Sequence, residues 1–163
     1  VKKSAPNRQT IDTAELIHEA RAFADLEAQR TSPQIVVDLP ENLPKIVVDR
    51  IMIEQVLLNL IKNGIEAMHD TPVERRRLNI GARQIDARLL QVEVADNGHG
   101  LAEEDVEKIF APFYTTKQEG MGIGLAICRS IIEFHQGHLW VEARHEGGTV
   151  FRFTVPIEES DNE

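Results

Sequence analysis

The sequence is poor in the residues that support disulfide, nucleic-acid and membrane chemistry. Its 163 residues include one cysteine, Cys128, so no internal disulfide is possible and a reducing compartment is favoured. Lysine and arginine number 18 against 27 aspartates and glutamates, and the net charge of −9 excludes a broad cationic surface for nucleic acid or membrane. No apolar run approaches the roughly 18 residues of a membrane span. We expect one cytoplasmic globular domain.

The first residue is Val1, not methionine, so we expect a fragment. Its longer parent protein can carry an inner-membrane anchor upstream.

The familiar phosphate-binding loops are also missing. No G-x-x-x-x-G-K-[ST] stretch occurs, and the glycines of GMGIG are spaced G-x-G-x-G with no strand before them. This spacing excludes a Walker A loop and the dinucleotide-binding fingerprint. Alternate glycines before an amphipathic helix still suit an anion, because free amides and the positive end of a helix attract negative charge.

Hydrophobic patterning predicts helices interleaved with strands. Helices are expected over 11–30, over 49–68, from 101 onward and after the glycine segment. Strands are expected over 35–39, 46–48, 78–83, 89–95, 138–143 and 149–155. The sum is an α+β sandwich, with an antiparallel or mixed sheet covered on one face by helices.

The ends of the chain are polar. We expect 1–10 to be a linker, 11–157 to form the domain, and the acidic 158–163 to be a disordered tail.

Three polar side chains share one face of the otherwise apolar helix 49–68. Asn59 and Asn63 are four residues apart and Glu66 follows three later. Burying such groups is costly unless each finds a partner, which is either a neighbouring loop or a ligand. Amide and carboxylate oxygens are hard donors that suit Mg²⁺.

Asp96 follows a predicted strand and opens the stretch DNGHG. The stretch is either a simple turn or a nucleobase site, in which Asp96 accepts a hydrogen bond from an exocyclic amine. In the second interpretation Gly98 and Gly100 let the ring approach.

The stretch IFAPFYTTK gathers aromatic residues in a chain that is only 5% aromatic. Its phenylalanines, Phe110 and Phe113, favour packing over stacking on a ligand. The polar residues that follow, Thr115, Thr116 and Lys117, are placed to reach phosphate oxygens.

Taken in order, four stretches resemble the boxes of the GHKL superfamily, and specifically the catalytic ATP-binding domain of sensor histidine kinases. VLLNLIKNGIEAM is similar to the N box, DNGHG to the first glycine box, IFAPFYTTK to the phenylalanine box and GMGIGLAI to the second glycine box. GGTVFRFTVP resembles the closing strand pair, and the match runs from about Ile11 to Pro156. The resemblance implies a Bergerat fold, a two-layer α/β sandwich that holds ATP between helices and a lid.

The resemblance also assigns roles to single residues. Asn63 would coordinate Mg²⁺, Asn59 would contact the phosphates, Asp96 would bind the adenine amine, and Lys117 would join the two asparagines in catalysis. The nucleotide-binding residues it implies are Asn59, Asn63, Glu66, Asp96, Gly98, Gly100, Phe110, Thr115, Thr116, Lys117, Gly120, Met121, Gly122, Gly124, Leu125 and Thr149.

Within the superfamily, the residue at position 59 distinguishes members that transfer the phosphoryl group of ATP from members that hydrolyse ATP. Hydrolysing members resembling gyrase, Hsp90 and MutL carry a glutamate there as the base for water, and the amide of Asn59 has no useful basicity. The resemblance therefore implies phosphoryl transfer from ATP to a histidine. A GHKL ATPase, an anti-sigma-type serine kinase and a binding module without catalysis remain as alternatives.

The acceptor histidine is expected on another domain. His18-Glu19 superficially resembles the acceptor motif, but the proline that should follow is absent, and all six histidines are interpreted as structural or surface residues. The partners implied are a histidine-bearing dimerisation hairpin of the same parent and the receiver domain of a response regulator. The parent would be a homodimer and this fragment a monomer. The short segment between Phe113 and Gly120 resembles that of oxygen-sensing, nitrogen-regulatory and dicarboxylate-sensing kinases.

Overall fold

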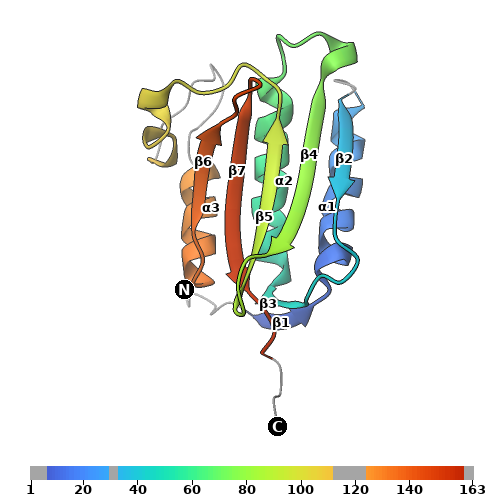
Figure 1. Cartoon of the computed structure of the whole chain (residues 1–163), viewed down its shortest axis with the longest axis vertical. Coiled ribbons are helices and arrows are strands. Elements are labelled where there is room, and N and C mark those ends of the chain that lie inside the picture. The colour runs from blue at the N-terminus through green and yellow to red at the C-terminus, as the bar shows by residue number, and fades with distance from the viewer. Residues whose placement is uncertain (1–6, 30–32, 112–123, 160–163) are drawn as a thin grey trace, which may run out of the picture.

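The main layer of the protein is a five-stranded sheet. The computed structural model describes residues 7–29, 33–111 and 124–159. The strands of the sheet lie in the order β2-β4-β5-β7-β6 (Figure 1). Their bounds are Gln34–Asp38 for β2, Arg77–Gln84 for β4, Leu89–Asp96 for β5, Leu139–Ala143 for β6 and Thr149–Pro156 for β7. β2 runs parallel to β4 and the other neighbours are antiparallel, so the sheet is mixed.

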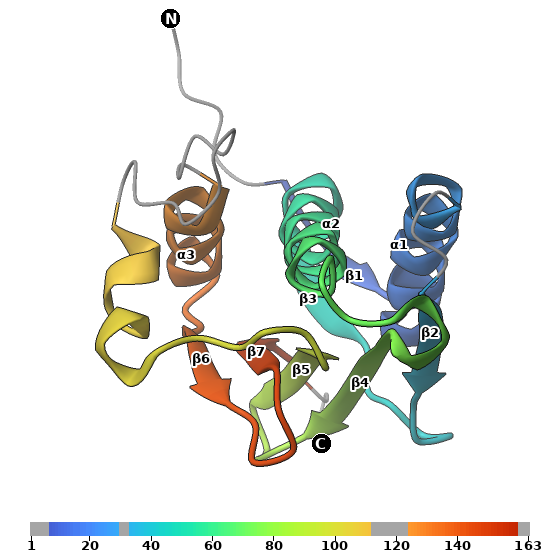
Figure 2. The same ribbon diagram turned by 90° about the horizontal axis from the view of Figure 1, so that it is seen from above.

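Three helices of the described residues form the second layer. α1 (Thr13–Ala28), α2 (Arg50–Ala67) and α3 (Gly124–Phe134) lie side by side on one face of the sheet, as the view from above shows (Figure 2). A small second sheet pairs β1 (Arg8–Ile11) with β3 (Ile46–Asp49) at one end of the helix layer. The expected α+β sandwich with helices on one face is confirmed.

Helix α2 begins where its cap dictates and is buried along one stripe. The Asp49 carboxylate accepts from the Met52 amide at 3.1 Å, which satisfies one free amide of the first turn. Residues facing the sheet at helical spacing are buried: Ile53, Val56, Leu57, Leu60, Ile61 and Gly64. The cap and the stripe place the polar face of α2 away from the core.

A buried histidine joins the end of α3 to the start of α2. The Nε2 atom of His135 lies 3.0 Å from the Asp49 amide, and its Nδ1 atom lies 2.7 Å from the Ile131 carbonyl. A backbone amide can only donate, so Nε2 accepts and Nδ1 donates its proton to the Ile131 carbonyl. This histidine is structural, and it fixes the packing of α3 against α2.

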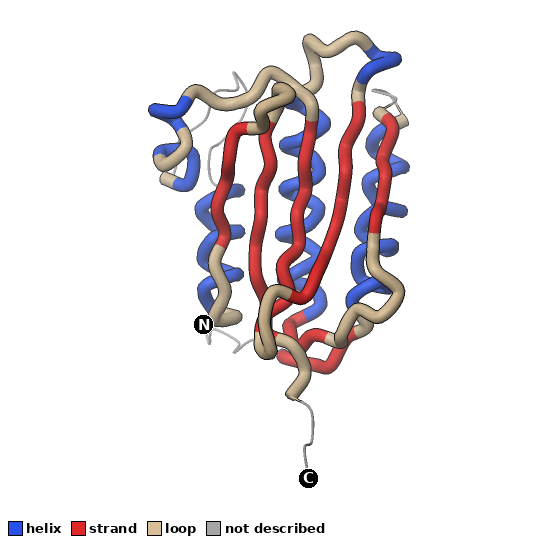
Figure 3. Tube along the Cα trace, viewed as in Figure 1, coloured by secondary structure: helices blue, strands red, loops and turns tan. Residues whose placement is uncertain are grey.

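One difference from the expected elements lies after residue 101 (Figure 3). The helix expected from residue 101 is replaced by two short 3-10 turns, Glu103–Asp105 and Lys108–Phe110. Pro112 follows in the sequence and disfavours a helical conformation at Ala111, directly after the second turn. The strands expected over 35–39 and 46–48 lie in different sheets, because β2 joins β4 in the large sheet and β3 joins β1.

The polar ends of the chain contact the domain. β1 begins at Arg8, inside the stretch expected to be a linker, and Arg8 pairs with Asp49 of β3. The amide of Glu158 donates to the Lys45 carbonyl at 2.9 Å, at the start of the expected tail. Among the helices of the described ranges, none has the length and apolar character needed to cross a membrane.

Candidate functional site

Asp96 is a buried carboxylate at the end of β5. Asp96 is only 2% exposed. The Oδ1 atom of its carboxylate accepts a hydrogen bond from the Gly98 amide at 2.8 Å. The Thr149 amide of β7 donates to the same carboxylate. Burial raises the pKa of Asp96 above its ordinary value, although these two amides and the nearby Arg144 and His99 oppose the rise. The central strand therefore presents a desolvated acceptor with fixed direction, which suits an amine donor.

The loop after Asp96 is docked on the end of α2. The His99 amide donates to the Ala67 carbonyl at 3.1 Å, and a Cβ at Gly98 would lie 2.2 Å from the same oxygen. Only glycine allows this approach, so Gly98 has a packing reason that the sequence interpretation did not include. Gly100 has a φ of +79°, the left-handed region that favours glycine. Base contact by these two glycines stays a prediction.

Asn59 and Asn63 form one polar unit on α2. The Nδ2 atom of Asn63 donates to Oδ1 of Asn59 at 3.1 Å, as expected for residues one turn apart. Gly124, the first residue of α3, faces this unit: a Cβ there would lie 2.5 Å from Nδ2 of Asn59. The structure thus brings together three predicted site residues from two helices. Leu125 follows on α3, half-buried against the core.

Two other predicted site residues, Glu66 and Phe110, lie in surroundings that differ from each other. Glu66 is exposed at the last turn of α2 and takes part in a polar interaction. Phe110 is buried in the core, edge-on to the Phe151 ring at 6.4 Å between centroids, with the Arg129 guanidinium 4.9 Å from its own centroid. These contacts support packing as the role of Phe110.

Several predicted residues belong to the segment 112–123, outside the described residues. They are Thr115, Thr116, Lys117, Gly120, Met121 and Gly122. Their proposed roles at the phosphates stay predictions.

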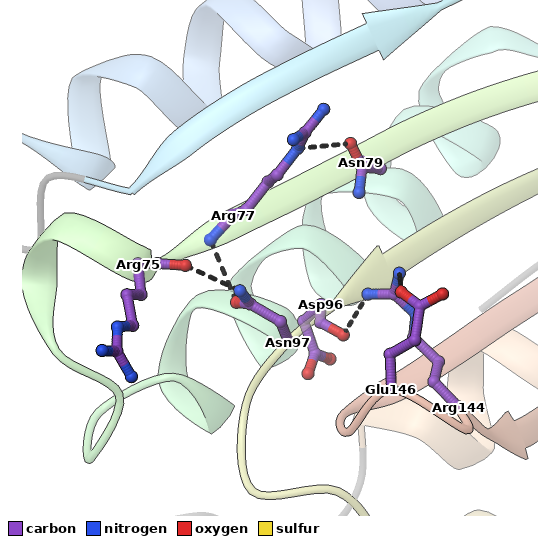
Figure 4. A network of polar contacts seen from close by, with 7 residues as sticks. All are labelled: Arg75, Arg77, Asn79, Asp96, Asn97, Arg144 and Glu146. Carbon is purple, nitrogen blue, oxygen red and sulfur yellow. Dashed lines mark hydrogen bonds and ion pairs between the residues drawn. The ribbon is translucent and has the colours of Figure 1, made fainter.

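The sequence interpretation missed two residues beside Asp96. Arg144, in the β6–β7 turn, donates from Nη1 to the Asp96 carbonyl at 2.8 Å (Figure 4). Gly148 has a φ of +99°, and a Cβ there would lie 2.1 Å from the same carbonyl oxygen. Gly148 carried a signal in the Gly-Gly turn, whereas Arg144 carried none, because its partner is 48 residues away in the chain.

The donors of the site fit a magnesium ion shared with phosphates. Within the described ranges, no group of three or more His, Cys, Asp or Glu side chains could hold a metal by itself. Mg²⁺ keeps several waters and relies on one or two protein oxygens plus substrate phosphates, so a full protein cage is not needed. The amide oxygen of Asn63 is a donor of the required hard type.

Comparison with known proteins assigns the chain to a family. The family model described as histidine kinase-, DNA gyrase B-, and HSP90-like ATPase matches residues 48–159. The chain belongs to this family. The matched stretch includes Asn59, Asn63, Asp96 and Thr149, so the resemblance drawn from the four boxes is confirmed at the level of the family.

Solved structures narrow the assignment within the ATPase family. A nucleotide-free catalytic domain of the histidine kinase ThkA is 34% identical with a TM-score of 0.82, over 93% of this chain and 96% of that one. The chain is thus a catalytic domain of the histidine kinase kind. A second structure shows ThkA in complex with the response regulator protein TrrA. The matching chain of that structure is 33% identical, with a TM-score of 0.77 over 92% of this chain and 42% of that one.

Curated relatives in the family are much longer proteins. The C4-dicarboxylate transport sensor DctS of Rhodobacter capsulatus is 40% identical over 157 residues, and the sensor FixL of Bradyrhizobium diazoefficiens is 36% identical over 156. Each match covers 96% of this chain but only 24% and 30% of the relative. The chain spans less than a third of the length of these relatives.

Proposed function

We propose that this domain binds Mg²⁺·ATP and transfers its γ-phosphoryl group to a histidine on a separate dimerisation hairpin of a longer, homodimeric protein. The P–O bond to the leaving ADP breaks as a bond to an imidazole nitrogen forms, and the imidazole proton passes to solvent. The phosphoryl group would then pass to an aspartate carboxylate on a response regulator, as the P–N bond to the imidazole breaks and a P–O bond to the carboxylate forms. The named complex of ThkA with a response regulator supports this kind of partner.

The observation that carries the proposal is the amide at position 59. A side-chain amide is neutral and has no useful basicity, so the group one turn before the proposed metal ligand cannot take a proton from water. The Asn59 side chain is held there by its bond to Asn63 and by the close approach of Gly124. A site without a base at this position positions a phosphoryl group and neutralises its charge better than it activates water.

In this proposal, different residues bind the adenine and the phosphates of ATP. Asp96 would accept from the adenine amine, and its buried carboxylate gives direction to that bond. Asn63 would hold the Mg²⁺, which supplies charge neutralisation at the phosphates when bound, and Asn59 would orient Asn63. Because ATP and receiver domains are cytoplasmic, we place the domain in the cytoplasm. We expect the isolated chain to be a monomer, because the proposed dimerisation hairpin is a separate part of the parent protein.

The test mixes this chain with a histidine-bearing hairpin from its parent protein and γ-labelled ATP. Acid-labile, base-stable phosphate on the hairpin is the expected product, and a hairpin with His→Gln should stay unlabelled. Steady release of inorganic phosphate by the chain alone would instead support an ATPase. Acid-stable phosphoserine on a protein partner would support a serine kinase, and each of these outcomes would overturn the proposal.

A further inference from the structure

The turn between β6 and β7 reaches the main chain of Asp96 from outside the four boxes. Arg144 donates to the Asp96 carbonyl at 2.8 Å, and the backbone of Gly148 is pressed against the same oxygen. The turn is itself closed by main-chain bonds, from the Arg144 amide to the Gly148 carbonyl and from the Gly147 amide to the Arg144 carbonyl, both at 3.1 Å. These two bonds fix the main chain of the turn from which the Arg144 side chain extends.

The contact lies on the β7 side of Asp96, where the pairing of β5 with β7 has ended while β4 still pairs with Asp96 through Leu78. The β5–β7 ladder ends at Ala95 and Val150, so Asp96 is one residue beyond the last pair with β7. The Arg144 guanidinium bonds the carbonyl at that point, and the Gly98 and Thr149 amides hold the carboxylate. Main chain and side chain of Asp96 are thus fixed separately.

Arg144 also contributes charge beside a buried acid. Arg144 from the β6–β7 turn and His99 from the following loop face Asp96, and the Arg144 guanidinium also lies 3.7 Å from the carboxylate of Glu146 in the same turn. The other elements packed on it are uncharged there, with Gly64 of α2 and Leu78 of β4 next to its side chain. Burial raises the pKa of Asp96, and the Arg144 charge acts against that rise.

We propose that Arg144 is a positioning residue for nucleotide binding: it holds the Asp96 main chain at the end of β5 and supplies positive charge beside the carboxylate. It does so without touching the nucleotide. The inference rests on the proposed function, because the ligand that reports on Asp96 is Mg²⁺·ATP.

Two substitutions separate the hydrogen bond from the charge. Arg144→Gln keeps an amide donor and removes the charge, whereas Arg144→Lys keeps the charge and loses the planar guanidinium. Mg²⁺·ATP is titrated into each variant by calorimetry between pH 5 and pH 8, and the pH at which affinity has fallen by half is recorded. The titration of ATP itself is the same for every variant.

Arg144→Gln is expected to bind ATP about fivefold more weakly at pH 7. Without the Arg144 charge the pKa of Asp96 rises further, so the carboxylate is protonated at a higher pH, and a protonated carboxyl is a poorer acceptor. The pH of half-loss should therefore move upward by roughly half a unit. Arg144→Lys should return it to the wild-type value while restoring only part of the affinity.

Arg152→Gln is the matched control. Arg152 lies on the open face of the same sheet and is exposed to a similar extent, 26% against 23% for Arg144. It pairs with Glu93 at 3.0 Å and Glu142 at 2.9 Å, and neither residue contacts Asp96 in the described contacts. Its loss should leave ATP affinity within twofold and the pH of half-loss unchanged.

The outcomes separate this inference from the proposed function. If Arg144→Gln loses affinity with an unchanged pH of half-loss, or if Arg152→Gln matches it in both readouts, Arg144 is merely structural and the inference is overturned. A wild-type chain that binds no Mg²⁺·ATP at any pH would defeat the proposed function instead. Melting temperatures of all variants confirm that folded protein is compared.

Discussion

The two ends of the proposed nucleotide site are built in different ways. At the adenine end, Asp96 is 2% exposed and its carboxylate is held by main-chain amides that belong to the sheet and its loops. At the phosphate end, Asn59 and Asn63 are half-buried on α2 and hold each other through one side-chain bond of 3.1 Å. The Asp96 carboxylate is thus held by main-chain amides, whereas the positions of the Asn59 and Asn63 side chains depend on their own side-chain conformations.

This difference indicates how each end responds to mutation. A carboxylate held by main chain is already oriented before a ligand arrives, so a change there alters affinity. A pair of amides on a helix face can reorient together with phosphates and metal, so a change there alters the rate of transfer more than the affinity. The predictions below test that separation, from the largest expected effect to the smallest.

Asn63→Ala should have the largest effect. The rate of phosphoryl transfer to the hairpin is expected to fall by about 10²–10³-fold, because a group that neutralises developing charge is lost. Affinity for ATP measured without Mg²⁺ should change by less than about threefold. Initial rates of acid-labile labelling and calorimetry supply the two numbers.

The control for Asn63→Ala is Asn79→Ala. Asn79 is an amide on β4 whose Oδ1 accepts from Arg77 on the open face of the sheet (Figure 4). It should leave both measurements unchanged. A loss of metal-free affinity as large as the loss of rate would show that the two ends are not separable.

Asp96→Asn should weaken ATP binding by about 10–100-fold, the value of a hydrogen bond to a charged acceptor. The same substitution should change the pH dependence of stability. Because the folded-state pKa of Asp96 is raised, the stability that its protonated form contributes is present below the unfolded pKa, ordinarily 3.8, and is lost as pH rises through the folded pKa. Urea denaturation of both proteins at several pH values measures this term.

The sign of the stability difference is the decisive readout for Asp96→Asn. The stability of the variant minus that of the wild type should increase as the pH rises from below 3.8 towards neutrality, because asparagine has no proton to lose. A difference that stays constant with pH would show that Asp96 is not destabilised by burial.

Gly124→Ala should slow transfer by about tenfold and leave the fold intact. The added Cβ would lie 2.5 Å from Nδ2 of Asn59, so the amide must move and its bond to Asn63 is lost. Alanine is a better helix residue than glycine, so the melting temperature should not fall. Binding of adenosine, which lacks phosphates, should be unchanged.

Gly81→Ala is the matched control for Gly124→Ala. Gly81 lies in β4, and a Cβ there would meet its nearest atom, the Asp38 carbonyl oxygen, at an ordinary 3.5 Å. Transfer should stay within twofold of wild type. Equal losses in the two variants would argue against a specific contact between α3 and Asn59.

Phe110→Leu should have the smallest functional effect. Phe110 packs on Phe151 and under Arg129, so we expect a loss of about 1 kcal/mol in the free energy of unfolding. ATP affinity should stay within twofold. A selective loss of affinity without loss of stability would return Phe110 to the nucleotide site and contradict its assignment to the core.

The sequence alone determined the order of the motifs and most of the elements, but not β1 or the 3-10 turns after residue 101. A helix was predicted over 49–68, where α2 lies, and strands were predicted over 78–83 and 89–95, where β4 and β5 lie. The bond between Asn59 and Asn63 is local, because residues four apart on a helix must face the same way. Local patterns of this kind depend on helix and strand periodicity, which the sequence carries directly.

Only the tertiary structure decided which distant residues meet. It separated β2 from β3 into two sheets, joined Arg144 to Asp96 across 48 residues, and placed Gly124 of α3 over Asn59 of α2. No periodicity encodes such contacts, since each depends on how whole elements pack through the core. The physical reason is that side-chain spacing fixes one element at a time, whereas a site at the meeting point of helices, strands and turns is fixed by their combined burial.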